Sequence, residues 1–138
     1  MISLPREAAI GFAINAVLSL AFFVGIFGLA QHLLGWAQLA PDFVPQSIAV
    51  ALMSALVPAL VARGKLGGTV RSVLLRAVVF AIGGAVLGVV LMLLTTAAAL
   101  PPIAWGTALA LKMLYGGSLG ALVTTLVLRR MLASHARL

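Results

Sequence analysis

Four long apolar runs dominate the chain, and short segments carrying charge, proline or glycine separate them. The runs cover about residues 8–30, 43–62, 77–100 and 103–128. Each is close to the roughly 20 residues that a helix needs to cross a hydrocarbon core about 30 Å thick. The pattern predicts an all-α integral membrane protein in which residues 1–138 form a single transmembrane four-helix domain.

The composition supports this prediction. Hydrophobic residues make up 64% of the chain and charged residues only 8%, whereas a soluble domain carries about a quarter charged residues. The chain has no cysteine, which excludes disulfides and thiolate metal sites. We therefore expect packing alone to hold the helices together.

The basic residues predict the orientation. Segment 63–76 and the tail 129–138 are basic, and together with Arg6 they hold eight of the nine Lys and Arg residues. Because short basic segments stay in the cytoplasm, we expect both termini and the 63–76 loop on that side of a bacterial inner membrane. The simplest topology is two hairpins joined by this loop. The net charge of +7 thus reflects topology and does not indicate nucleic-acid binding.

A repeated phrase suggests that one hairpin is a copy of the other. The sequence ALVPALVARGK at 55–65 resembles ALVTTLVLRRM at 121–131, and FAINAVLS at 12–19 resembles FAIGGAVLG at 80–88. A duplicated two-helix unit would give parallel repeats related by an axis along the membrane normal. A chain built mostly of Ala, Leu and Val also produces such matches by composition, so the duplication stays open.

Small residues recur at four-residue spacing and predict the packing faces. Helices in lipid associate through small residues that allow close approach of their backbones. The stripes are Gly11, Asn15 and Ser19 in the first run, Gly84 and Gly88 in the third, and Gly116 and Gly120 in the fourth. We expect these residues to lie between helices, where Asn15 either bonds across an interface or lines a pathway.

Pro58 lies inside the second run, where its ring displaces the carbonyl of Ser54 from its regular helical hydrogen bond. A kink is therefore expected. The kink either forms a hinge beside a cavity or is an ordinary proline bend in which a neighbouring hydroxyl satisfies the carbonyl. We favour the ordinary bend.

Lys112 is the one charge expected within a span. It lies roughly 25 Å from the inner boundary at 1.5 Å per residue, near the outer edge of the core. The favoured interpretation is that its ammonium snorkels to the headgroups. The alternative is an outer polar cluster of Lys112, Asp42, His32 and Gln31 that contacts a substrate or an anionic lipid headgroup.

Other chemistry has no visible residues. His32 and His135 lack metal partners at ligand spacing, and no cofactor motif or catalytic constellation is present, so we expect neither an enzyme nor a metal or cofactor site. The leading hypothesis is an accessory or structural membrane subunit that packs against itself, as a homo-oligomer, or against a larger complex, with anionic lipid at its basic cytoplasmic face. The alternative is a small oligomeric transporter or channel for an apolar or anionic solute or lipid, with Lys112, Asn15 and the Pro58 kink along its path.

Overall fold

The computed structural model describes residues 2–29 and 32–137 and is built almost entirely of helices. Four helices are long and apolar enough to cross a membrane, one of them counted together with a short helix that precedes it. In chain order the elements are α1 (Leu4–Phe27), β1 (Leu33–Leu34), α2 (Trp36–Leu39), α3 (Phe43–Leu66), α4 (Val70–Ala97), β2 (Ile103–Ala104) and α5 (Trp105–Ala136). The prediction of an all-helical chain with four potential spans is confirmed.

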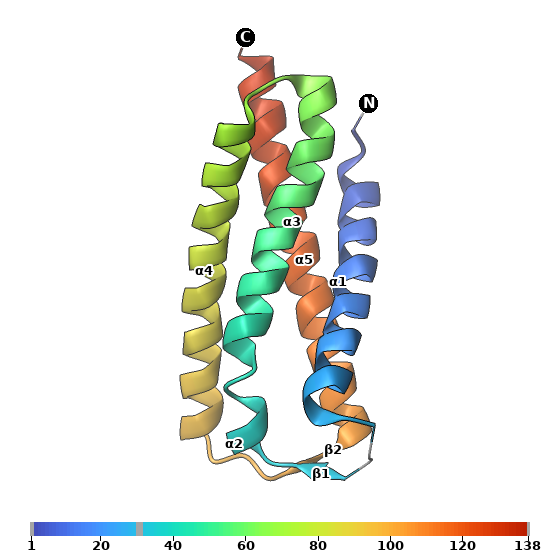
Figure 1. Cartoon of the computed structure of the whole chain (residues 1–138), viewed down its shortest axis with the longest axis vertical. Helices are drawn as coiled ribbons and strands as arrows, with labels where there is room; N and C mark the ends of the chain where they lie inside the picture. Colours follow the sequence, from blue (N-terminus) through green and yellow to red (C-terminus); the bar gives the residue numbers. More distant parts are fainter. Residues whose placement is uncertain (1, 30–31, 138) are drawn as a thin grey trace.

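The helices run alternately up and down in one elongated bundle (Figure 1). Both ends of the chain and the α3–α4 connection lie at one end of the bundle, which we call the basic end. Helix α2 and the two short strands lie at the opposite end, which we call the capped end. Helices α1 and α4 form the two edges in this view, and α3 and α5 lie between them.

The helices do not pack as the two expected hairpins. The close partners are α3 with α4 and α1 with α5, and α3 and α5 join these pairs in the centre. Helices α1 and α3, which follow each other in the chain, barely touch. The reason lies in the small-residue stripes, because the glycines of α4 receive the backbone of α3 and those of α5 receive α1.

At the basic end the helices extend beyond the predicted spans. Helix α3 continues to Leu66 and α4 begins at Val70, so the expected loop 63–76 shrinks to residues 67–69. Gly67 and Gly68 turn the chain with φ of 77° and 114°, values that favour glycine. The predicted tail is helical as far as Ala136. Basic residues are good helix formers, and their helices simply continue past the apolar runs.

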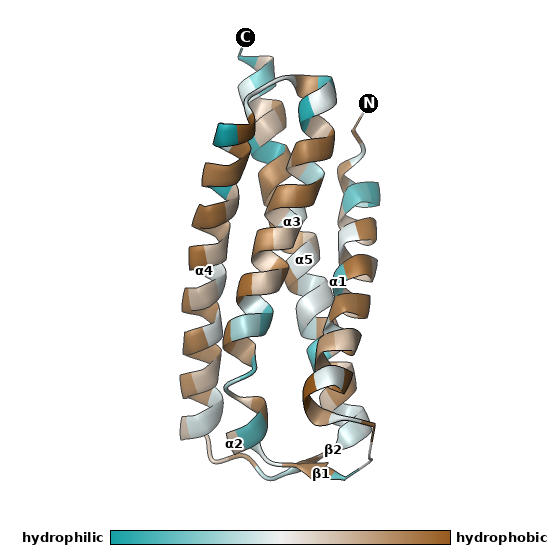
Figure 2. Cartoon of the chain, in the orientation of Figure 1, coloured by the Kyte–Doolittle hydropathy of each residue, from teal (hydrophilic) through white to brown (hydrophobic). Residues whose placement is uncertain are grey.

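The surface of the bundle is apolar and its centre holds small and polar residues (Figure 2). Large side chains such as Val17, Val79 and Leu93 are about 60% exposed. In contrast Asn15, Ser47 and Lys112 are no more than 3% exposed. This distribution suits a bundle surrounded by lipid, in which apolar side chains gain nothing by facing inward.

The capped end is closed by a small sheet and two indole rings. Strands β1 and β2 pair antiparallel, with Leu33 opposite Ala104. Trp36 donates its Nε1–H to the carbonyl of Pro101, and Trp105 donates to the carbonyl of Gly28, both at 3.0 Å. These bonds tie the two connections of this end to each other and to the end of α1.

Candidate functional site

Two rows of buried residues, spaced four apart in the sequence, face each other between α1 and α5. Phe23 extends the predicted row of α1 by one turn, and Lys112 and Thr124 extend the predicted row of α5 by one turn at each end. The buried rows are Gly11, Asn15, Ser19 and Phe23 on α1, and Lys112, Gly116, Gly120 and Thr124 on α5. A Cβ atom added at Gly11 would lie 2.8 Å from Thr124 Oγ1, and one added at Gly116 or Gly120 would collide with Ser19 or Asn15. The two backbones can approach this closely only because these positions carry no side chain.

Asn15 connects α1 to α3 in the middle of the bundle. Its Nδ2 donates to the carbonyl of Gly11 at 2.7 Å and to Ser54 Oγ at 2.8 Å. Its Oδ1 is buried and has no hydrogen-bond partner among the described residues. An unsatisfied buried acceptor costs about 1–3 kcal/mol, and this oxygen carries that cost inside the bundle.

Gln46 forms a second cross-link nearer the capped end. Its Nε2 donates to Ser19 Oγ at 3.0 Å and to the backbone carbonyl of Lys112 at 2.9 Å. Its Oε1 is also buried without a partner in the described part of the chain. One amide side chain thus joins α1, α3 and α5 and keeps an acceptor unused.

The carbonyl of Ser54, which loses its regular helical hydrogen bond to Pro58, accepts a hydrogen bond from a hydroxyl group instead. Helix α3 continues through Pro58 to Leu66, and the carbonyl of Ser54 accepts a hydrogen bond from Thr124 Oγ1 at 3.4 Å. This is the ordinary proline arrangement, with a donor on α5 that the sequence alone could not identify.

Lys112 does not snorkel, and that expectation is wrong. Its side chain is 1% exposed and its Nζ lies 3.4 Å from Oδ2 of Asp42, whose side chain is 6% exposed. The same Nζ donates to the carbonyl of Leu39 at 3.1 Å and lies 3.4 Å from the ring centroid of Phe43. The turn between α2 and α3 folds over the ammonium and supplies a carboxylate, a carbonyl and an aromatic face, so the charge is satisfied without reaching the headgroups.

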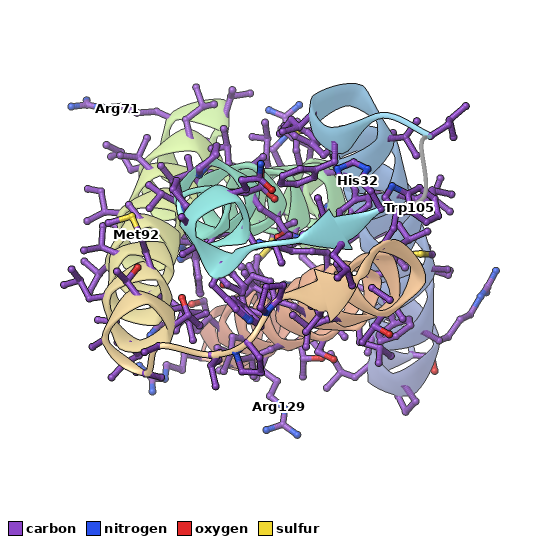
Figure 3. All side chains as sticks on the ribbon, turned by 90° about the horizontal axis from the view of Figure 1, so that it is seen from below. His32, Arg71, Met92, Trp105 and Arg129 are labelled. Carbon is purple, nitrogen blue, oxygen red and sulfur yellow. The ribbon has the colours of Figure 1, made fainter. Side chains whose placement is uncertain are left out.

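Of the proposed outer cluster, the structure brings together Lys112 and Asp42. His32 is exposed at the capped end near Trp105 (Figure 3). Gln31 lies outside the described residues. The second oxygen of Asp42, Oδ1, is buried without a hydrogen-bond partner among the residues described.

The glycines of α4 face α3. A Cβ at Gly84 would lie 2.5 Å from the carbonyl oxygen of Ser47 and 2.8 Å from Ala51 Cβ, and one at Gly88 would lie 2.6 Å from the carbonyl oxygen of Phe43. On the other side of α3, the hydroxyls of Ser47 and Tyr115 share a short hydrogen bond. Helix α3 is therefore held by backbone contact on one side and by hydroxyl pairing with α5 on the other.

A surface groove lies between α1 and α3. Its larger part has a volume of about 210 Å³, with apolar walls and Asn15, Ser54 and Thr124 among its lining residues. A second hollow of about 120 Å³ is lined by Ser19 and Gln46 and shares Leu18 and Met53 with the first. Asn15 and Gln46 therefore line two adjoining hollows between α1 and α3, which together we call the α1–α3 groove.

Sequence reasoning missed Gln46, Thr124 and the α1–α3 groove itself. One signal was available for Thr124, because extending the Gly116 and Gly120 stripe by one turn in each direction reaches Lys112 and Thr124. No such signal existed for Gln46, because its hydrogen bonds to α1 and α5 form only when these helices pack beside α3.

The described residues contain no group of three side chains that could hold a metal ion. Comparison of the whole chain with protein families, curated proteins and solved structures found no match. The proposals below therefore depend on the geometry of this chain.

Proposed function

We propose that the protein is an accessory membrane subunit whose α1–α3 groove receives a transmembrane helix of a partner protein. The observation that supports this proposal best is the apolar groove between α1 and α3, whose two hollows measure about 210 Å³ and 120 Å³. In lipid, close van der Waals packing and occasional hydrogen bonds drive helix association. The groove supplies apolar walls for such packing.

A helix suits this groove better than a lipid tail. The groove runs from the level of Glu7 to that of Phe22 on α1, which is about 22 Å at 1.5 Å per residue. This length covers most of a core about 30 Å thick, whereas the tail of one lipid covers only its own leaflet.

The test is to block the groove and compare the result with a matched change on a free surface. Ile14 is 51% exposed on the groove wall, and Val79 on α4 is 61% exposed away from it. After gentle extraction with native lipid, native mass spectrometry of the wild type should show a stoichiometric second protein. Ile14→Trp should lower the amount of retained partner at least about tenfold, which corresponds to a loss of about 1.4 kcal/mol in binding free energy. Val79→Trp should retain the partner at the wild-type level.

Equal retention by both variants would contradict the proposal. So would a purified protein that carries only lipid. A homo-oligomer dispersed by Ile14→Trp would identify a second copy of this chain as the occupant and would replace the larger complex with self-assembly.

Transport remains the second candidate because the buried polar groups form a row. Next to the Lys112–Asp42 pair, Gln46 donates to the backbone carbonyl of Lys112 and to Ser19, and Asn15 lies one turn from Ser19 on α1. The α1–α3 groove extends from there to Glu7. A transport path must be wet. Since the chain has no cysteine, Ser19→Cys and Ser54→Cys can be probed individually with a small hydrophilic thiosulfonate. Rapid reaction at both would favour transport, and protection at both would favour the accessory role.

We also propose that the basic end faces the cytoplasm of a bacterial inner membrane, and that the chain arose by duplication of a two-helix unit. The concentration of Lys and Arg at that end supports the first proposal. The packing supports the second, since exchanging α1 with α4 and α3 with α5 reproduces the pairing of close partners. A chain carrying the second half twice should then insert as a four-helix bundle, and failure to do so would count against duplication.

A further inference from the structure

A hollow of about 200 Å³ lies at the basic end, away from the α1–α3 groove. It forms where the end of α3 and the start of α4 meet the last turns of α5. Its lining residues are Leu66, Gly67, Gly68, Ser72, Val73, Arg76, Met131, Ser134 and His135. Two basic side chains from different helices, Arg76 and His135, therefore share one hollow.

The ring of His135 is fixed in place. Its Nδ1 lies 3.2 Å from the carbonyl oxygen of Leu66 at the end of α3, and a carbonyl can only accept, so Nδ1 carries the proton. This bond leaves Nε2 for a second interaction with a ligand. Arg76 adds a planar guanidinium with five N–H groups.

No described carboxylate balances the charge of Arg76. The chain has only two acidic side chains. Asp42 is paired with Lys112 at the capped end, and Glu7 is not among the residues that line the hollow. The hollow is thus a cationic site without a protein counter-ion in the described part of the chain, and its complement is an anion.

The neighbouring backbone favours an anion as well. Helix α4 is 28 residues long and begins at the rim of the hollow, where the side chain of Thr69 accepts from Ser72 N–H. The first-turn N–H groups that line the hollow, those of Ser72 and Val73, are both bonded to Thr69, and they lie at the positive end of the helix dipole. The hydroxyls of Ser72 and Ser134 donate to carbonyls of their own segments, so the side-chain donor that remains for a ligand is the guanidinium of Arg76.

The position of the hollow along the helices further restricts the class of anion that it can bind. Arg76 is followed directly by the apolar run from Ala77 to Leu100, so the hollow lies where the hydrocarbon core would end. This is the level of phospholipid phosphates in a membrane. A guanidinium fork matches two oxygens of a phosphate group.

We propose that this hollow binds a phosphate group, presented either by an anionic phospholipid headgroup or by a free phosphoryl compound. The site is independent of the α1–α3 groove and of any partner bound there. Arg76 and His135 are its binding residues, and the start of α4 forms its wall.

The test compares charge removal inside and outside the hollow in the full-length protein. Arg71 and Arg129 point away from the bundle (Figure 3), so Arg71→Gln and Arg129→Gln remove the same charge as Arg76→Gln without touching the site. Each variant is placed in phosphatidylcholine nanodiscs with increasing phosphatidylglycerol, and native mass spectrometry measures the retained phosphatidylglycerol. In phosphatidylcholine alone, titration calorimetry with inorganic phosphate at constant ionic strength tests the free ligand. Circular dichroism checks that each variant is folded.

Arg76→Gln and His135→Gln should weaken binding, and the loss with Arg76→Gln should be about tenfold larger than with either control, because a charge-assisted hydrogen bond is lost in addition to surface attraction. Retention of phosphatidylglycerol without a phosphate isotherm identifies a lipid site, and the reverse identifies a soluble ligand. Equal losses in Arg76→Gln, Arg71→Gln and Arg129→Gln would overturn the proposal in favour of diffuse attraction. Absence of both ligands from the wild type would also overturn it.

Discussion

At the scale of single residues, burial of the Lys112–Asp42 pair has a large desolvation free energy. Both side chains are almost fully buried, and separating two such charges from water costs several kcal/mol for each ion before their attraction is counted. The carbonyl of Leu39 and the ring of Phe43 contribute to this attraction. The pair thus holds the α2–α3 corner against α5.

Lys112→Met should destabilise the protein by about 3–5 kcal/mol, because Asp42 is left as an unpaired buried charge. The double variant Lys112→Met with Asp42→Asn should recover much of this loss. Guanidinium unfolding in detergent micelles measures both. A single variant as stable as the wild type would show that the pair contributes nothing to the fold.

The hydrogen bond from Thr124 to the Ser54 carbonyl depends on Pro58. Thr124→Val should cost about 0.6 kcal/mol, the average for bonds between membrane helices. In a Pro58→Ala background the same change should cost almost nothing, because residue 58 then supplies its own N–H to that carbonyl. The same unfolding assay completes the double-mutant cycle. An equal cost in both backgrounds would refute the coupling.

Sequence reasoning singled out Asn15, Lys112 and Pro58 as unusual residues, since polar groups and proline stand out in apolar runs. It could not name their partners. Asp42 precedes α3 by one residue and reaches Lys112 only because α2 turns the chain back over the bundle. Such a contact depends on the path of a connection, which hydropathy does not record.

At the scale of elements, glycine position decides which helices touch. Gly83 and Gly84 are neighbours on α4, but only Gly84 meets the backbone of α3. A Cβ at Gly83 would meet no atom outside its own helical surroundings within 4 Å. The two positions therefore form a matched pair in one helix.

Gly84→Ala should destabilise the bundle by about 1–3 kcal/mol, the usual cost of overpacking, because the backbone carbonyl of Ser47 cannot move aside. Gly83→Ala should be neutral or stabilise by up to about 1 kcal/mol through helix propensity. Thermal unfolding of both variants in the same detergent makes the comparison. Equal effects would mean that α3 and α4 are not in backbone contact.

The spans could be predicted from the sequence because a hydrophobic run of sufficient length needs no information about its neighbours. The pairing of spans could not. These helices are apolar on nearly every side, so the hydropathy pattern does not show which face is inward. The glycine stripes marked the faces but not the partners, and the expected hairpins followed chain order, whereas the packing pairs α1 with α5.

At the scale of the whole molecule, the two ends differ sharply in charge. The absence of cysteine allows single-cysteine labelling with a membrane-impermeant maleimide. Gln38→Cys at the capped end should react in cells whose inner membrane is intact, and Ala136→Cys at the basic end should react only after the membrane is opened. Both positions are exposed. The reverse pattern would invert the proposed orientation.

The central claim is that a partner helix occupies the α1–α3 groove, and photocrosslinking in native membranes tests it most directly. A photoreactive amino acid replaces Val57, which is 44% exposed on the groove wall, or Leu93 on α4, which is 59% exposed away from it. One discrete protein adduct is expected, and from Val57 alone. Peptide mapping should place that adduct in a transmembrane segment, and Ile14→Trp should abolish it. Adducts to lipid alone, or equal protein adducts from both positions, would contradict the account.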